Sequence, residues 1–116
     1  MLIVSRKIHL SELPTLENKM FYNDFEMVKA VADLDQEILA LNAELHAELE
    51  QLLLDNGSSQ KDLYGFNIYF DGKLEYDSII NAPRNREAGF PRSGREVADP
   101  QARAKIKEIV QRWIEN

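Results

Sequence analysis

His46 and Glu50 are of types and at a spacing that could support proton transfer or metal binding. They stand four residues apart in Glu44-Leu-His-Ala-Glu-Leu-Glu50, so a helix would place both on one flank of its leucine stripe. A carboxylate beside an imidazole favours the imidazolium, and such a pair could shuttle a proton or supply two metal ligands. The alternative interpretation is a solvated ion pair at the edge of a helix interface, because perturbed ion pairs are common outside functional sites.

A second set of candidates depends on a β-hairpin that we predict over residues 63–83. Two runs rich in aromatic and β-branched residues flank Asp71-Gly72, which is typical of a hairpin. We expect a three-residue loop, Asp71 to Lys73, that pairs Phe70 with Leu74, because this register gives the hairpin one apolar face. The side chains expected on that face are those of Phe66, Ile68, Phe70, Leu74, Tyr76 and Ile80.

The opposite face of this hairpin is polar. The predicted register sets Asn67 across from Asp77 and Tyr69 beside Glu75, and Asn81 lies further along the same side. An amide, a carboxylate and a phenol on a rigid sheet could orient a small polar ligand. They could equally form the solvent side of a sheet whose other face is covered.

The segment that follows the hairpin is rich in arginine. Residues 84–98 predict one long loop, and the part from Arg84 to Arg95 holds four Arg and two Gly. Guanidinium groups make forked contacts to carboxylate or phosphate, and Arg84 and Arg86 leave the polar face of the hairpin directly. The alternative is that both arginines pair with surplus acids of the preceding chain, as surface arginines ordinarily do.

Hydrophobic periodicity and capping residues predict the elements that must position these side chains. In chain order they are a strand at 2–4, a short helix capped by Ser11 and ending at about 22–24, a hairpin of 27–34 and 37–41, a helix over 43–56, the hairpin described above, and a helix from Asp99-Pro100 to the C-terminus. Leu13, Leu16 and Met20 have helical spacing in the short helix. Alternation in residues 27–34 puts Val28, Ala30, Ala32 and Leu34 on one apolar face and Val31 on the other. Paired strands separated by helices predict one α+β domain over residues 1–116. Its mostly antiparallel sheet would be built from two hairpins plus an N-terminal strand, with three helices.

Two of the predicted helices carry specific expectations. Asn42 is expected to cap the helix over 43–56, whose Leu45, Leu49, Leu52 and Leu53 would form a single stripe that ends before Gly57. In the last helix, Trp113 continues the stripe begun by Ala102, Ile106, Ile109 and Val110. We therefore expect Trp113 to be largely buried.

Composition excludes several classes of protein. The chain has 116 residues, no Cys and a net charge of −6, which rules out thiol catalysis and zinc fingers and argues against a nucleic-acid binder. No apolar run approaches the length of a membrane span, so we expect a cytoplasmic protein without membrane contact. No set of three good metal ligands follows from spacing, so we expect no metal and no cofactor. Residues 1–83 hold 6 Lys/Arg against 15 Asp/Glu, whereas residues 84–116 hold 8 against 5, which hints at a local anion site.

Several segments together resemble a family of small bacterial proteins described as a domain of unknown function. They are Glu44-Leu-His-Ala-Glu48, Leu52-Leu-Leu54, Gly57-Ser-Ser-Gln60 with Asp62-Leu63 and Gly65, and Tyr76-Asp-Ser-Ile-Ile-Asn81. The resemblance runs from about Met27 to the last helix. It implies a small stand-alone bacterial protein and no particular activity. The family pattern has a more regular Arg-Pro stretch before an Asn-Arg pair, where this chain has Ala82-Pro83-Arg84.

Three functional hypotheses follow. The first is a binding protein that holds a small anionic ligand between the arginine-rich loop and the polar hairpin face, with Asn67, Tyr69, Asp77, Asn81, Arg84 and Arg86 as ligand-binding residues. The second is a metal-assisted hydrolase that uses His46, Glu50 and Asp77 as catalytic groups. The third is a homodimer or other homo-oligomeric interaction module, since the apolar strands show no obvious edge protection.

Overall fold

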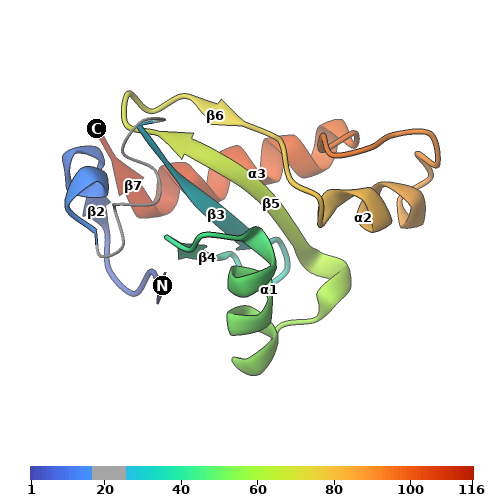
Figure 1. The fold of residues 1–116 in the computed structure, drawn as a ribbon, viewed down its shortest axis with the longest axis horizontal. Helices are drawn as coiled ribbons and strands as arrows, with labels where there is room; N and C mark the ends of the chain where they lie inside the picture. The colour runs from blue at the N-terminus through green and yellow to red at the C-terminus, as the bar shows by residue number, and fades with distance from the viewer. Residues whose placement is uncertain (17–25) are drawn as a thin grey trace.

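An antiparallel five-stranded sheet organises the computed structural model, which describes residues 1–16 and 26–116 (Figure 1). The strands lie in the order β1-β4-β3-β5-β6. The central strand is β3, the first strand of the first predicted hairpin. Their bounds are Leu2–Ile3 for β1, Met27–Asp33 for β3, Ile38–Leu41 for β4, Leu63–Tyr69 for β5 and Leu74–Glu75 for β6. This arrangement confirms the α+β class and the mostly antiparallel sheet.

The two faces of the sheet are covered by different helices. Helix α3 (Pro100–Trp113) crosses one face, and helix α1 (His46–Asp55) covers part of the other (Figure 1). The alternation in β3 serves both layers. Val28 belongs to the larger apolar cluster on the α3 side, and Val31 belongs to the smaller cluster on the α1 side.

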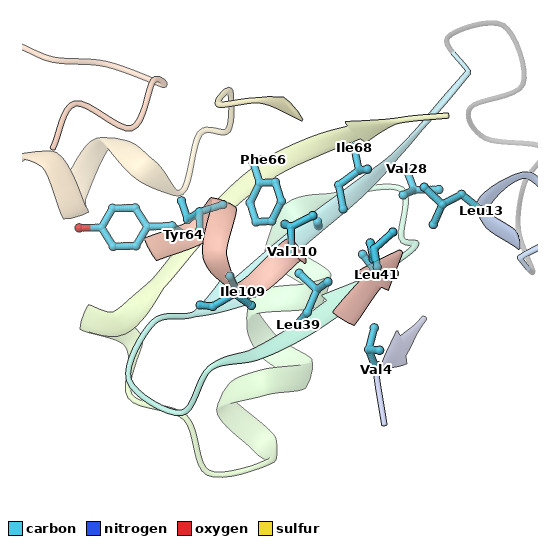
Figure 2. Close-up of a cluster of buried hydrophobic side chains, with 14 of the residues drawn as sticks. Val4, Leu13, Val28, Leu39, Leu41, Tyr64, Phe66, Ile68, Ile109 and Val110 are labelled. Atoms are coloured by element: carbon cyan, nitrogen blue, oxygen red, sulfur yellow. The ribbon is translucent and has the colours of Figure 1, made fainter. Parts of the chain in front are cut away.

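The larger cluster is the main core of the protein. Figure 2 shows Phe66 and Ile68 of β5 beside Ile109 and Val110 of α3, with Leu39 and Leu41 of β4 in the same layer. Burying a side chain of this size stabilises a fold by about 1.5–3 kcal/mol. The apolar faces predicted for residues 27–34 and for Phe66, Ile68, Phe70, Leu74 and Tyr76 are therefore confirmed.

Helix α3 begins as predicted but ends earlier. The Asp99 side chain accepts a hydrogen bond of 2.9 Å from the Gln101 N–H, and Pro100 occupies the first turn. After Trp113 the chain forms strand β7 (Ile114–Glu115), which pairs in parallel with β2 (Ile8–His9). Trp113 is half-buried rather than largely buried, because its indole N–H reaches past the core edge to donate to the Glu37 carbonyl at 2.9 Å.

The N-terminal helix is a 3-10 helix, η1 (Leu10–Thr15), and Ser11 is not its cap. The cap is His9, whose Nδ1 accepts from the Ser11 N–H at 3.1 Å. Leu13 is buried against the core, as its spacing predicted. The predicted continuation through Met20 to 22–24 lies outside the described residues.

Helix α1 starts later than predicted, and Asn42 does not cap it. Leu45 holds the cap position, with its N–H donating to the Glu48 carboxylate at 2.9 Å. Asn42 has a positive φ of 73° and is buried, and its side-chain amide has no hydrogen-bond partner within residues 1–16 and 26–116. Leu45 is 58% exposed, so it does not belong to the buried stripe. Gly57 ends the helix with φ +100°, as predicted.

The register predicted for the second hairpin is wrong by two residues. Ile68, not Phe70, pairs with Leu74, and Asn67 pairs with Glu75. The Phe70 N–H donates instead to the Glu26 carbonyl at 2.8 Å, so Phe70 extends the pairing with the central strand. A shift of two residues keeps each side chain of the paired strands on its predicted face, so the two faces of these strands were still predicted correctly.

The chain leaves the sheet after Glu75 instead of continuing as a strand to Pro83. Residues predicted as strand end and long loop form helix α2 (Asn81–Glu87), in whose first turn Pro83 is tolerated. Ile80 consequently packs in the smaller cluster on the α1 side, not on the predicted apolar face. A short 3-10 helix, η3 (Gln60–Asp62), precedes β5.

Candidate functional site

A row of polar side chains crosses the sheet on the face that α1 leaves partly open. Lys29 of β3, Asn67 of β5 and Glu75 of β6 occupy neighbouring positions in the strand register. The Asn67 Nδ2 donates to Glu75 Oε1 at 2.9 Å, and the Tyr69 hydroxyl donates to the same oxygen at 3.3 Å. Asn67 is only 3% exposed, and its Oδ1 is buried without a hydrogen-bond partner among the described residues.

His46 reaches this row from the first turn of α1. Its Nε2 lies 2.8 Å from the Phe66 carbonyl, which can only accept, so Nε2 carries the proton and Nδ1 is the acceptor of the ring. Burial, together with a smaller effect of the nearby Lys29 charge, lowers the pKa of His46 to about 4. The Phe66 bond, the Asp77 charge and the contact with Asn67 oppose this shift without reversing it. The imidazole is therefore neutral at neutral pH.

Arg95 and Asp77 face each other beside the row. The Arg95 Nε donates to Asp77 Oδ1 at 2.8 Å, and both side chains are well exposed. The Arg95 carbonyl is fixed by the Ser78 N–H and by the Asn81 amide, each at 3.0 Å. Because an exposed ion pair contributes about 0–1 kcal/mol, the guanidinium can change partners at little cost while its backbone stays in place.

A pocket of about 210 Å³ opens over Lys29, His46 and Arg95. Its lining consists of Lys29, Leu45, His46, Ala47, Ile79 and Arg95. Burial, followed by the charge of Arg95, lowers the pKa of Lys29, and Asp77 and Glu75 oppose the shift. Leu45 and Ile79 are two of the three large hydrophobic side chains that are exposed in the described part of the chain. Two cations and two exposed apolar side chains therefore share one opening.

Arg84 lies outside this pocket and links β5 to α1. Its guanidinium is 3% exposed, and it donates through Nε to the Leu63 carbonyl at 3.1 Å and through Nη2 to the Glu50 carboxylate at 2.5 Å. Glu50 is thus tied to Arg84, whereas His46 is tied to Phe66, so the predicted His46–Glu50 pair does not form.

Asn81 substitutes for a strand partner of β5. Its Oδ1 accepts from the Gly65 N–H and its Nδ2 donates to the Gly65 carbonyl, both at 2.8 Å. Gly65 has to be glycine because a Cβ there would lie 2.5 Å from the Ser78 Oγ and 2.6 Å from its Cβ.

Asn85, which the sequence interpretation missed, orders the segment that leads to Arg95. Its Nδ2 donates to the carbonyls of Gly94 at 2.9 Å and Glu96 at 2.7 Å, and its Oδ1 accepts from the Ala98 N–H at 3.1 Å. An amide four residues after Asn81 on a short helix was the available signal. This loop is therefore held by amide contacts to its backbone rather than by arginine–acid pairs alone.

The six predicted ligand-binding residues fall into three groups. Asn67, Tyr69 and Asp77 lie together on the polar face, with Lys29, His46 and Arg95 beside them. Asn81 and Arg84 bind the backbone of β5, and Arg86 is exposed on α2. Two charged residues of the pocket, Lys29 and Arg95, are absent from the predicted set. Lys29 comes from β3, far from the hairpin in the chain, and Arg95 comes from the end of the loop.

Metal-binding groups and membrane-spanning helices are both absent from the described residues. Within residues 1–16 and 26–116, no group of three or more His, Asp or Glu side chains is placed to hold a metal ion. In the same part of the chain, no helix combines the length and apolarity needed to cross a membrane.

The fold and this pocket define a small α+β protein with a polar sheet face partly covered by one helix. The chain belongs to the family described as protein of unknown function DUF5674, whose model matches residues 2–113. This confirms the resemblance to a domain of unknown function. No curated protein and no solved structure matches the chain.

Proposed function

We propose that the protein binds a small anionic ligand in the pocket lined by Lys29, His46 and Arg95. The observation that carries the proposal is the combination of two cations with two exposed hydrophobic side chains, Leu45 and Ile79, around one opening. Arg95 takes the role that the sequence suggested for Arg84 and Arg86.

The charges in the pocket favour an anionic group. Lys29 is half-buried next to Arg95, and each cation makes the other less favourable, which is one cause of the lowered pKa of Lys29. An anion placed between them would relieve this repulsion. The first turn of α1, which contributes His46 and Ala47 to the lining, adds the positive end of a helix dipole.

The apolar rim favours an organic ligand over a bare ion. Leu45 is 58% exposed and Ile79 is 68% exposed, and because both line the same opening they form an apolar patch rather than two isolated surface side chains. A volume of about 210 Å³ is below the roughly 300–1,000 Å³ of pockets for drug-sized ligands. The pocket therefore suits a molecule of metabolite size that carries an acidic group and a short apolar part.

Calorimetric titration with isocaproate, a short branched carboxylate, tests the proposal. The variant Arg95→Gln should bind at least about tenfold more weakly, since a charge-assisted hydrogen bond contributes about 1.5–3 kcal/mol. Lys29→Gln should weaken binding in the same direction. Inorganic phosphate titrated in parallel reports on the charge requirement without the apolar part.

Arg92→Gln is the matched control, because Arg92 is exposed in the same loop and does not line the pocket. It changes the net charge as Arg95→Gln does and should leave the affinity unchanged. Thermal denaturation without ligand checks that each variant is folded. Equal affinities of the Arg95 and Arg92 variants would refute the proposed pocket.

A further inference from the structure

The two cations that line the pocket have two carboxylates close behind them, which restricts the class of anion that fits. Lys29 and Arg95 are the positive groups, while Glu75 and Asp77 are the negative groups whose charges act on Lys29. His46 adds no charge at neutral pH. A simple anion beside the two cations would therefore also be repelled by these carboxylates, whereas a ligand that carries both signs also has a favourable interaction with the negative groups.

The Arg95–Asp77 pair is arranged to receive such a ligand. Its two members are joined by a single 2.8 Å hydrogen bond and are 60% and 46% exposed. A ligand carboxylate can take a place on the Arg95 guanidinium while a neighbouring ammonium donates to the Asp77 carboxylate. Both ionic groups of the protein then keep a partner of opposite charge.

We propose that the anionic ligand of this pocket is a zwitterion, an α-amino acid with an aliphatic side chain. The carboxylate faces Arg95 and Lys29, the ammonium faces Asp77, and the side chain lies between Leu45 and Ile79. This inference rests on the proposed function and narrows its ligand to one chemical class.

Three probes of similar shape test the inference by calorimetry on the intact protein. They are L-leucine, isocaproate, which lacks its ammonium, and isopentylamine, which lacks its carboxylate. L-leucine should bind at least about tenfold more tightly than either, because each analogue leaves a charged group of the protein without its partner.

Two variants assign the two ends of the ligand. Asp77→Asn should remove the preference for L-leucine over isocaproate, and Arg95→Gln should remove the preference over isopentylamine. Glu44→Gln is the control, because Glu44 is an exposed acid just before α1 that does not line the pocket, and it should keep both preferences.

The outcomes separate this inference from the proposed function. Isocaproate that binds as tightly as L-leucine overturns the zwitterion inference and leaves the anion pocket standing. A preference for L-leucine that persists in Asp77→Asn overturns the placement of the ammonium and with it the inference. Binding of none of the three probes overturns both.

Discussion

Mild acid is expected to destabilise the protein through His46. Burial lowers the pKa of this imidazole from 6.5 to about 4 in the folded state, whereas the unfolded chain keeps the ordinary value. Between these two values the unfolded chain binds a proton that the folded protein does not. The stability that depends on a neutral His46 is therefore fully present above about pH 6.5 and decreases as the pH falls through this window. Below about pH 4 it has been lost and the free energy of unfolding changes no further through this group.

The size of the effect follows from the width of that window. One pKa unit corresponds to about 1.4 kcal/mol, so the whole shift is worth about 3 kcal/mol and the loss at about pH 5 is about 2 kcal/mol. A loss of this size is a large fraction of the roughly 5–15 kcal/mol that stabilises a typical domain. This shift already includes the repulsion between protonated His46 and Lys29.

Urea denaturation followed by circular dichroism from about pH 7.5 to pH 5 measures this loss. His46→Gln is the matched variant, because its amide can still donate to the Phe66 carbonyl but does not titrate. Its stability should fall by about 2 kcal/mol less over this range than that of the wild type. The rest of the sequence is the same in both proteins, so the difference between their pH profiles reports on His46.

A direct NMR titration of the imidazole signals provides the second test. The protein has two histidines, and the exposed His9 gives an internal comparison for the buried His46. The His46 signals should not move until the pH falls well below 6. Titration of His46 near its ordinary pKa, or identical pH profiles for wild type and His46→Gln, would show that the burial argument is wrong.

Two further predictions concern the edge of β5. Gly65→Ala should destabilise the fold by about 1–3 kcal/mol because its Cβ would overlap Ser78, and adding Ser78→Gly should recover part of the loss in urea denaturation. Arg84→Met should cost about 3–5 kcal/mol because it leaves the Glu50 carboxylate without its buried partner. The exposed Arg86→Met should change stability by less than about 0.5 kcal/mol, and equal losses in the two arginine variants would contradict the assigned role of Arg84.

Sequence patterns correctly predicted the structural features that depend only on residues close together in the chain. Alternation in residues 27–34 placed Val28 and Val31 on opposite faces, because a strand has a period of two whatever it packs against. Asp99-Pro100 and Gly57 marked helix ends because capping depends on groups within one turn.

Features decided by distant groups were not predictable in the same way. The hairpin register depends on the bond between Phe70 and Glu26, which no pattern within the hairpin contains. Helix α2 was missed because Asn81 and Asn85 use their amides on distant backbone, and the four-residue spacing of two amides does not by itself indicate this use.

The candidate site was predicted in part for the same reason. Asn67, Tyr69 and Asp77 were placed on one face by the strand period alone. Lys29 and Arg95 join them through strand order and through a loop held by Asn85, neither of which can be derived from spacing.

The side chains that cover β5 also affect how the protein behaves when it is concentrated. Beyond the short strand β6, the edge of β5 carries the peptide group of Gly65 and the carbonyl of Leu63, and Asn81 and Arg84 occupy these hydrogen-bonding positions. An edge satisfied in this way gives a strand from another molecule nothing to pair with, so aggregation by sheet extension is blocked there. Asn81→Ala would reopen that edge, and light scattering at high protein concentration should then show assemblies that the wild type does not form.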